Sequence, residues 1–206
     1  KHAKLFYTDD ITSPSKDRGK FIDESIDLVK KILDISQGKA LILFTSKADM
    51  NAVYTRLKAL NLNYTLIKQN EISSQQQLIY KFKQDVNSVL LGTGVFWEGI
   101  SIEGIALSNL IIYKLPFPLP EPIINEKCKR SKNPLEEVLV PEMIIKLKQG
   151  VGRLIRNKTD KGIVSIIDSR LGDKSKASYK EKVWQALPIK QRTNSLKELQ
   201  SFYDNL

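Results

Sequence analysis

The sequence is poor in the side chains that most metal and nucleophile chemistry needs, with one cysteine, Cys128, and one histidine, His2. A single thiol cannot form a disulfide within the chain, and an iron–sulfur cluster needs about four thiolates. A zinc site needs several Cys or His ligands, and His2 lies at the end of the chain, where side chains are poorly held. We therefore expect no iron–sulfur cluster, no metal site and no His-dependent nucleophile.

Long apolar runs are absent as well. No stretch approaches the ~20 residues that span a bilayer, and the first residues lack the apolar segment of a signal peptide. We therefore expect no membrane partner and a cytoplasmic location. The chain begins at Lys1 rather than at methionine, so we also expect it to be a segment of a longer protein.

Acidic residues are outnumbered, because 33 Lys and Arg face 23 Asp and Glu, for a net charge of +10. The excess is +3 over residues 1–120 (15 against 12) and +7 over residues 121–206 (18 against 11). A basic surplus favours phosphate-bearing partners through its long-range field and through counterion release. A solvated lysine-rich surface would explain the same surplus.

Amphipathic and apolar segments alternate from residue 21 onward, which is typical of β-α-β units around a parallel sheet. We therefore predict one α/β domain over residues 1–206, with a mainly parallel central sheet flanked by helices. The predicted helices cover residues 21–36, 48–60 and 74–84, and the five predicted strands cover residues 40–44, 64–67, 88–91, 107–115 and 162–167.

Two stretches depart from this alternation. Residues 116–141 hold most of the chain's eight prolines, which cannot donate to a central sheet ladder. This composition predicts a surface excursion with at most a short helix inside it. The tail over residues 175–205 has the pattern of two amphipathic helices split near Pro188.

The strongest signal for chemistry is QGVGRLIR at residues 149–156, which continues a helical pattern. At 100° per residue, Arg153 and Arg156 return to the helix face that holds Gln149. The two glycines of the run would let another backbone come close. Arginine suits phosphoryl transfer because its charge does not titrate and its planar fork matches phosphate oxygens. The alternative is an ordinary helix end with a glycine stop.

A second run, LLGTGVFWEGIS at residues 90–101, leads from a buried strand into a glycine-rich loop. Its glycines would let backbone amides approach a ligand, while Thr93, Glu98 and Ser101 address ribose, water or phosphate. The alternative is an ordinary glycine turn with Trp97 filling the core.

Polar side chains also follow two other predicted strands. Thr45 and Ser46 stand where a strand meets a helix start, a geometry that can hold a nucleic-acid phosphate. Ser46 and Asp49 equally have the spacing of a helix capping box. Asp168 and Arg170 end the last strand, where ligands of open α/β sheets gather. They are either a brace for the arginine-bearing helix or a purely structural ion pair.

One run that suggests nucleotide binding is rejected. The sequence GKA at residues 38–40 resembles the end of a P-loop, but it lacks the upstream glycine and the following Ser or Thr, and it precedes a strand. The sequence has no other phosphate-gripping lysine loop and no DExH/D-type acidic run. The main phosphate and metal contacts of a bound nucleotide would therefore lie outside this chain.

Taken in order, these runs resemble the second motor lobe of the DinG/XPD group of superfamily 2 helicases. ALILFTS at residues 40–46 resembles motif IV, GTGVFWEGIS at 92–101 motif V, and QGVGRLIR at 149–156 motif VI. KLPFPLPEPI at 114–123 and IDSRL at 167–171 are similar to further signatures of the group. The resemblance spans nearly the whole chain and implies a RecA-like, P-loop NTPase-type helicase C-terminal domain.

The resemblance also implies roles for individual residues. An arginine finger and its neighbours would face ATP, two residues would touch the nucleotide edge, and hydroxyls would contact the backbone of single-stranded DNA. These residues are Arg156 as the finger with Arg153 and Gln149 beside it, Glu98 and Gly99 at the nucleotide edge, and Thr45, Ser46 and Thr93 on the DNA.

ATP and Mg²⁺ would be held mainly by a first RecA-like lobe that this chain lacks, so the chain alone is expected to be inactive. The sequence looks closest to the cluster-free DinG-like proteins of Gram-positive bacteria, which carry an N-terminal 3′→5′ exonuclease domain. The implied partners are single-stranded DNA, the first lobe and that exonuclease domain. One alternative is a non-hydrolysing nucleic-acid clamp that serves an attached nuclease. The other is a free-standing α/β nucleotide enzyme, which the missing P-loop and GxGxxG run disfavour.

Overall fold

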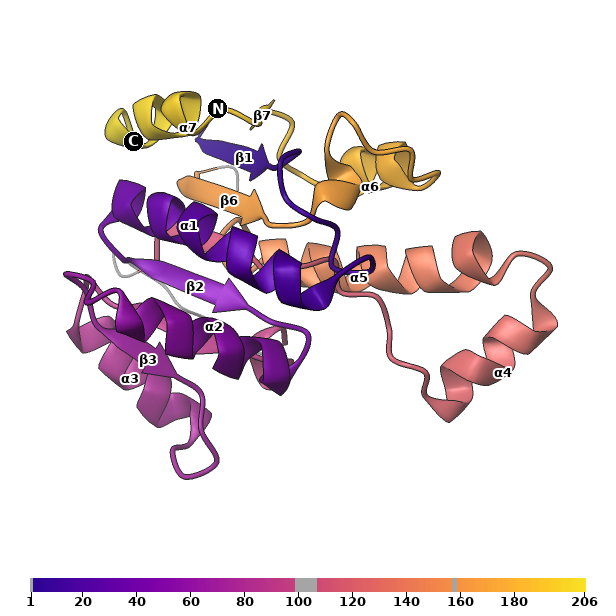
Figure 1. Cartoon of the computed structure of the whole chain (residues 1–206), viewed down its shortest axis with the longest axis horizontal. Helices are drawn as coiled ribbons and strands as arrows, with labels where there is room; N and C mark the ends of the chain where they lie inside the picture. Colours follow the sequence, from indigo (N-terminus) through magenta and orange to yellow (C-terminus); the bar gives the residue numbers. More distant parts are fainter. Residues whose placement is uncertain (1, 99–106, 157–158) are drawn as a thin grey trace.

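The computed structural model of the chain describes residues 2–98, 107–156 and 159–206. Its strands form one parallel sheet in the order β3-β4-β2-β5-β6-β1-β7 (Figure 1). This architecture confirms the predicted α/β class with a parallel sheet. The strands are β1 (Ala3–Tyr7), β2 (Ala40–Leu43), β3 (Leu66–Lys68), β4 (Val89–Gly92), β5 (Asn109–Ile112), β6 (Gly162–Ile166) and β7 (Arg192–Thr193).

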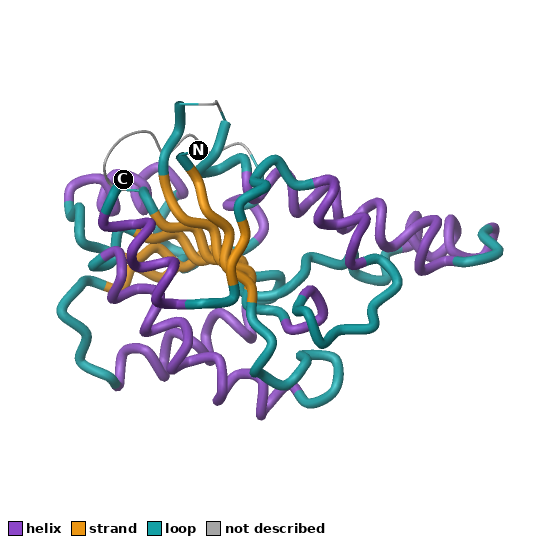
Figure 2. Tube along the Cα trace, turned by 90° about the horizontal axis from the view of Figure 1, so that it is seen from above, coloured by secondary structure: helices purple, strands orange, loops and turns teal. Residues whose placement is uncertain are grey.

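Helices cover both faces of the sheet (Figure 2). One face packs against α1 (Arg18–Ser36), α2 (Lys47–Ala59) and α7 (Leu196–Asp204), and the other against α3 (Gln75–Gln84), α5 (Val140–Val151) and α6 (Lys180–Ala186). The alternation along β2 illustrates the two cores, because Leu41 and Leu43 face one and Ala40 and Ile42 the other. Strands buried on both faces are mostly apolar, with Asn109 in β5 and Ser165 in β6 as buried polar residues, which is why they appear in the sequence as nearly continuous apolar runs.

The three predicted helices are α1, α2 and α3, and the five predicted strands are β2 to β6, with ends shifted by a few residues. The predicted set of strands was incomplete. β1 pairs with β6, from which it is far apart in the sequence, and the two-residue β7 pairs with β1 at the sheet edge. The two tail helices are α6 and α7, and β7 lies between them.

The strands end together. In the sheet register, Leu43 is opposite both Gly92 and Ile112, and Ile112 is opposite Ile166. The segments that follow β2, β4, β5 and β6 therefore leave the sheet at one edge, which we call the carboxyl edge. In open α/β sheets this edge is where ligands bind.

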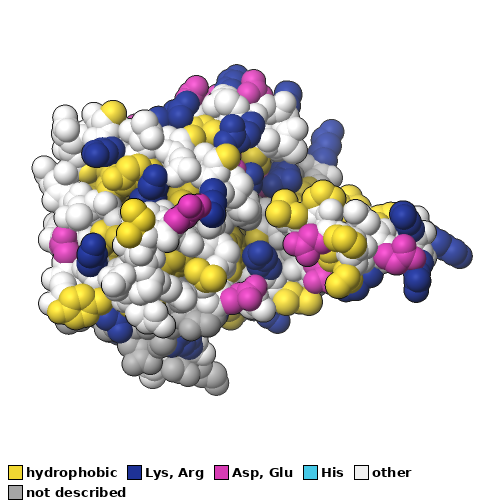
Figure 3. All heavy atoms as spheres, turned by 90° about the horizontal axis from the view of Figure 1, so that it is seen from below, with side chains coloured by type: hydrophobic (Ala, Val, Ile, Leu, Met, Phe, Trp, Pro, Cys, Tyr) yellow, Lys and Arg dark blue, Asp and Glu magenta, His cyan; other side chains and the backbone are white. Residues whose placement is uncertain are grey.

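The proline-rich segment forms an arm that projects from the body (Figures 1 and 3). It contains α4 (Pro122–Arg130) and a π-helical turn (Leu135–Leu139) that runs directly into α5. Helical structure in this segment therefore exceeds the predicted short helix. Pro141 has no N–H to donate, and the N–H of Val140 bonds to the carbonyl of Leu135, five residues back, so the helix is widened there.

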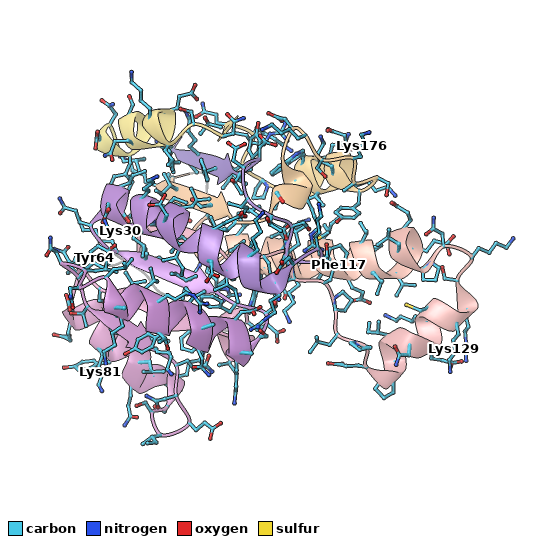
Figure 4. All side chains as sticks on the ribbon, viewed as in Figure 1. Lys30, Tyr64, Lys81, Phe117, Lys129 and Lys176 are labelled. Atoms are coloured by element: carbon cyan, nitrogen blue, oxygen red, sulfur yellow. The ribbon has the colours of Figure 1, made fainter. Side chains whose placement is uncertain are left out.

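The arm exposes apolar side chains among charged ones, as Figure 3 shows along its length. Leu119 and Ile123 are the most exposed of these, and Leu135 is also exposed. Lys129 marks the outer part of the arm, far from Lys30 and Tyr64 on the body, while Phe117 lies where the arm leaves the body (Figure 4).

Candidate functional site

Arg153 and Arg156 lie just beyond the end of α5. The helix ends at Val151, and Gly152 is its C-cap, with its backbone N–H bonded to Lys148 and Gly150 carbonyls. The expected continuation of a regular helix through residue 156 is therefore wrong. The two arginines lie in the segment that follows, and Gly152 itself keeps a right-handed helical backbone conformation.

Backbone carbonyls of the helix end orient both guanidinium groups. Nε of Arg153 donates to the carbonyl oxygen of Gln149 at 3.2 Å, and Nε of Arg156 donates to that of Gly152 at 3.3 Å. The backbone N–H of Arg156 donates to Oδ2 of Asp160 at 2.7 Å. Each arginine thus reaches back to the residue four positions before it.

The structure brings Glu98, Arg153 and Arg156 within electrostatic reach of one another. Partial burial lowers the pKa of Arg153 from its ordinary value, and the positive charge of Arg156 lowers it further, while Glu98 opposes the shift. Arg153 is half-buried, and Arg156 and Gln149 are exposed. The site therefore brings two guanidinium groups together with the carboxylates of Glu98 and Asp160.

The first glycine of the QGVGRLIR run accommodates a side chain and not a backbone. A Cβ on Gly150 would lie 2.7 Å from the ring of Trp97 and 3.4 Å from Leu43. A Cβ on Gly152 would meet only the carbonyl oxygens of Gln149 and Lys148, at 3.3 Å each. The expected approach of another backbone is therefore corrected to the approach of the Trp97 indole.

The loop after β4 is a glycine turn with Trp97 in the core. Residues Gly94–Phe96 form a short 3-10 turn, and a Cβ on Gly92 would lie 2.5 Å from the Phe96 ring. Trp97 is completely buried, and its Nε1 donates to the carbonyl oxygen of Phe44 at 2.8 Å. The buried Trp97 side chain agrees with the alternative interpretation of this run, while the ligand contacts expected of Thr93 and Glu98 stay predictions. Gly99 and Ser101, which were also singled out, lie outside the described residues.

Thr93 has an intramolecular partner that the sequence did not suggest. Its backbone N–H and its Oγ1 both donate to Oε1 of Gln69, at 2.7 and 3.2 Å. Phe44 donates its N–H to the carbonyl of Gly92 at 2.9 Å, so Thr93 and Thr45 leave adjacent strands side by side. Gln69 follows β3, and no spacing pattern links it to Thr93, which explains why sequence reasoning missed it.

Ser46 is the N-cap of α2, since its Oγ accepts the N–H of Asp49 at 3.1 Å. The predicted capping role of Ser46 is thus confirmed. The carboxylate of Asp49 turns elsewhere, to Nε of Arg18 at 2.7 Å and to Nζ of Lys114 at 2.5 Å. Arg18 was not singled out in the sequence, and Lys114 was named only as the first residue of the KLPFPLPEPI run, because their shared partner is distant from both along the chain.

Asp168 and Arg170 form a structural ion pair. Arg170 donates from Nε and Nη2 to the fully buried Asp168 carboxylate at 2.9 and 2.6 Å. Oδ2 of Asp168 also accepts the N–H of Leu115 at 2.9 Å, and the Arg170 guanidinium lies over the Phe117 ring at 5.1 Å. Although burial lowers the pKa of Arg170, Asp168 raises it overall. The pair therefore contacts the segment that leads into the arm, at Leu115 and Phe117. Of the two interpretations of the sequence, this agrees with a structural ion pair rather than with a brace for the arginine-bearing helix.

Within residues 2–98, 107–156 and 159–206, no group of three or more His, Cys, Asp or Glu side chains is placed to hold a metal ion. In the same part of the chain, no helix has the length and apolarity needed to cross a membrane.

Comparisons with known proteins place this geometry in a family context. Residues 29–190 match the family model described as helicase C-terminal domain. The ATP-dependent DNA helicase YoaA of Haemophilus influenzae is 37% identical over 186 residues, which cover 87% of this chain and 28% of that protein. The 3′-5′ exonuclease DinG of Bacillus subtilis is 34% identical over 189 residues, which cover 87% of this chain and 19% of that protein.

The fold is also that of solved helicase structures. A structure named XPD helicase superposes with a TM-score of 0.71 at 22% identity, and the match covers 93% of this chain and 35% of that one. At this identity the likeness concerns the fold alone.

Proposed function

Since the chain belongs to the helicase C-terminal domain family and has DinG- and YoaA-type relatives, we propose that it is the second motor lobe of a DinG-type ATP-dependent DNA helicase. The chain spans 28% and 19% of the two relatives described above. The first lobe, which would hold ATP and Mg²⁺ through its own phosphate loop, is then a separate part of the parent protein. This chain supplies the remaining half of the ATP site.

The observation that carries this proposal is that Arg153 and Arg156 both follow the end of α5 directly, each with its Nε on a backbone carbonyl of the helix end. Arg156 is the arginine finger, which stabilises negative charge on the transferring phosphoryl group, and Arg153 binds the neighbouring phosphate oxygens. Gln149, exposed one turn earlier, faces the same nucleotide. Glu98 and Gly99 touch the nucleotide edge.

Single-stranded DNA crosses the carboxyl edge at Thr45, Ser46 and Thr93. These residues leave adjacent strands and offer hydroxyls and backbone N–H groups, which are donors that suit phosphate oxygens. Gln69 Oε1 now accepts the two donors of Thr93 that a phosphate oxygen would take. When the DNA backbone binds, a phosphate oxygen therefore replaces Gln69 Oε1 as the acceptor of these two Thr93 donors.

The ATP and DNA contacts are coupled through the closure of the two lobes. ATP on the first lobe draws in Arg153 and Arg156, and the resulting movement shifts the Thr45 and Thr93 contacts along the strand. Hydrolysis removes the charge that the arginines bind and resets the domain.

The test is the DNA-stimulated ATPase rate of the full-length parent with Arg156→Ala. Loss of the finger is expected to lower kcat by about 10³-fold or more, with little change in KM for ATP. Arg130→Ala on the arm, whose native side chain pairs with Glu126, is the matched control and is expected to keep the parental rate. Equal rates for both variants would rule out the finger assignment.

A second candidate function is a non-hydrolysing clamp that holds DNA for an attached 3′→5′ exonuclease. It is favoured by the B. subtilis relative, whose name is that of an exonuclease. ATP binding by the full-length parent without turnover, together with exonuclease activity, would support the clamp over the motor.

A further inference from the structure

A buried carboxylate at the start of α2 holds two cations from other parts of the chain. Asp49 is 2% exposed, and its Oδ1 accepts Nε of Arg18 at 2.7 Å. Its Oδ2 accepts Nζ of Lys114 at 2.5 Å. Arg18 begins α1, and Lys114 follows β5, so the three residues connect three elements. We call this group the Asp49 cluster.

The cluster carries a net positive charge. Burial raises the pKa of Asp49, but the hydrogen bond and charge of Lys114, followed by the hydrogen bond from Arg18, lower it below its ordinary value overall. Asp49 is therefore ionised at neutral pH, and one negative charge faces two positive ones. The N-terminus of α2 adds partial positive charge beside them. One cation would suffice to neutralise the buried carboxylate, so the second is in excess.

Both cations of the Asp49 cluster are accessible to solvent. The side chain of Arg18 is 54% exposed and donates to Asp49 through Nε. Lys114 is 25% exposed and follows Tyr113, whose N–H bonds to the carbonyl of Leu43. Both cations thus lie at the carboxyl edge next to Thr45 and Ser46.

We propose that Arg18 and Lys114, positioned by Asp49, form a phosphate-binding site for the backbone of single-stranded DNA. The proposal rests on the proposed function, in which DNA crosses this edge at Thr45 and Ser46. Arginine and lysine are the main phosphate ligands of DNA-binding proteins. A carboxylate that fixes their side chains lowers the conformational entropy lost on binding.

A second ion pair between the same helices has a different character and serves as the control. Arg56 of α2 pairs with Asp23 of α1 at 2.8 Å, and both side chains are well exposed. One cation meets one anion there, so the pair has no excess charge. It also joins the last turns of α2 to the second turn of α1, away from Ser46 and the carboxyl edge.

The experiment measures binding of an oligo-dT strand to the full-length parent as a function of salt concentration, with Arg18→Gln, Lys114→Gln, Arg18→Lys and Arg56→Gln. The slope of log Kd against log salt is expected to fall by about 0.7 for each lost phosphate contact in Arg18→Gln and Lys114→Gln. The Kd is expected to rise about three- to tenfold in those two variants. Arg18→Lys, which keeps the charge, and Arg56→Gln are expected to retain the parental slope.

The KM for ATP without DNA is measured in parallel, because ATP phosphates share the same chemistry. An unchanged KM with a reduced salt slope supports the DNA site. Parental slopes in both Gln variants, or a raised KM with unchanged DNA affinity, would overturn it. Arg18→Lys keeps the positive charge beside Asp49, so a parental slope in this variant assigns the reduced slope of Arg18→Gln to the loss of that charge. Failure of the parent to bind DNA at all would instead overturn the proposed function.

Discussion

Trp97 and Gly150 are packed so closely that no side chain fits between them, since a Cβ on Gly150 would lie 2.7 Å from the indole. The same indole donates to the carbonyl oxygen of Phe44 at 2.8 Å. One buried side chain therefore joins the segment after β2, the loop after β4 and the helix that ends before Arg153. The relative positions of the proposed DNA-contacting segments and the arginine-bearing segment depend on this contact.

Replacement of Gly150 by alanine should consequently destabilise the domain. The new methyl group would overlap the fully buried Trp97 ring, and overpacking of this kind costs about 1–3 kcal/mol. Gly152→Ala is the matched control, because its Cβ would meet carbonyl oxygens at 3.3 Å in a helical backbone conformation, and we expect a change within about 0.5 kcal/mol. Urea unfolding of the chain gives both values, and equal stabilities would contradict the proposed packing role.

Stability at low pH should depend on Asp49. Lys114 and Arg18 hold its folded-state pKa below the ordinary value of 3.8, despite the opposing effect of burial. A depressed carboxyl pKa stabilises the fold above the unfolded value, and this stability is lost as the pH falls through the folded pKa.

We therefore expect the stability advantage of the native chain over Asp49→Asn to be constant near neutral pH and to shrink below about pH 4. The measurement is the free energy of unfolding of both proteins across that range. Other carboxylates, such as Glu24 and Glu136, titrate in both proteins, so the difference isolates Asp49. A difference that is independent of pH would show that its carboxylate is not held in the ionised form.

Most of the sheet could be predicted because its central strands are buried on both faces. Residues such as Ile42 and Leu90 stand in continuous apolar runs, and the helices between them have regular apolar spacing. β7 escaped prediction because it has only two residues, whereas β1, with five, precedes the alternation of amphipathic and apolar segments that revealed the other strands. Their pairing partners, including Gly162 opposite Ala3, are too distant in sequence for any local pattern to reveal them.

The candidate site was predictable in its residue types but not in its local geometry. Helical periodicity placed Arg153 and Arg156 on one face, but periodicity cannot show that Gly152 ends the helix before them. The Thr93–Gln69 and Asp49–Lys114 contacts join residues from different strand ends. Only the register of the sheet, set by pairings such as Leu43 with Gly92, brings those ends together.

ATP turnover by the isolated chain of 206 residues is the most direct measurement of whether its arginines serve a nucleotide held by another segment. With ATP, Mg²⁺ and single-stranded DNA present, we expect a rate no higher than that of the same chain carrying Arg156→Ala. Robust hydrolysis by the native chain that disappears in Arg156→Ala would show a complete active site within these residues, and would contradict the half-site account.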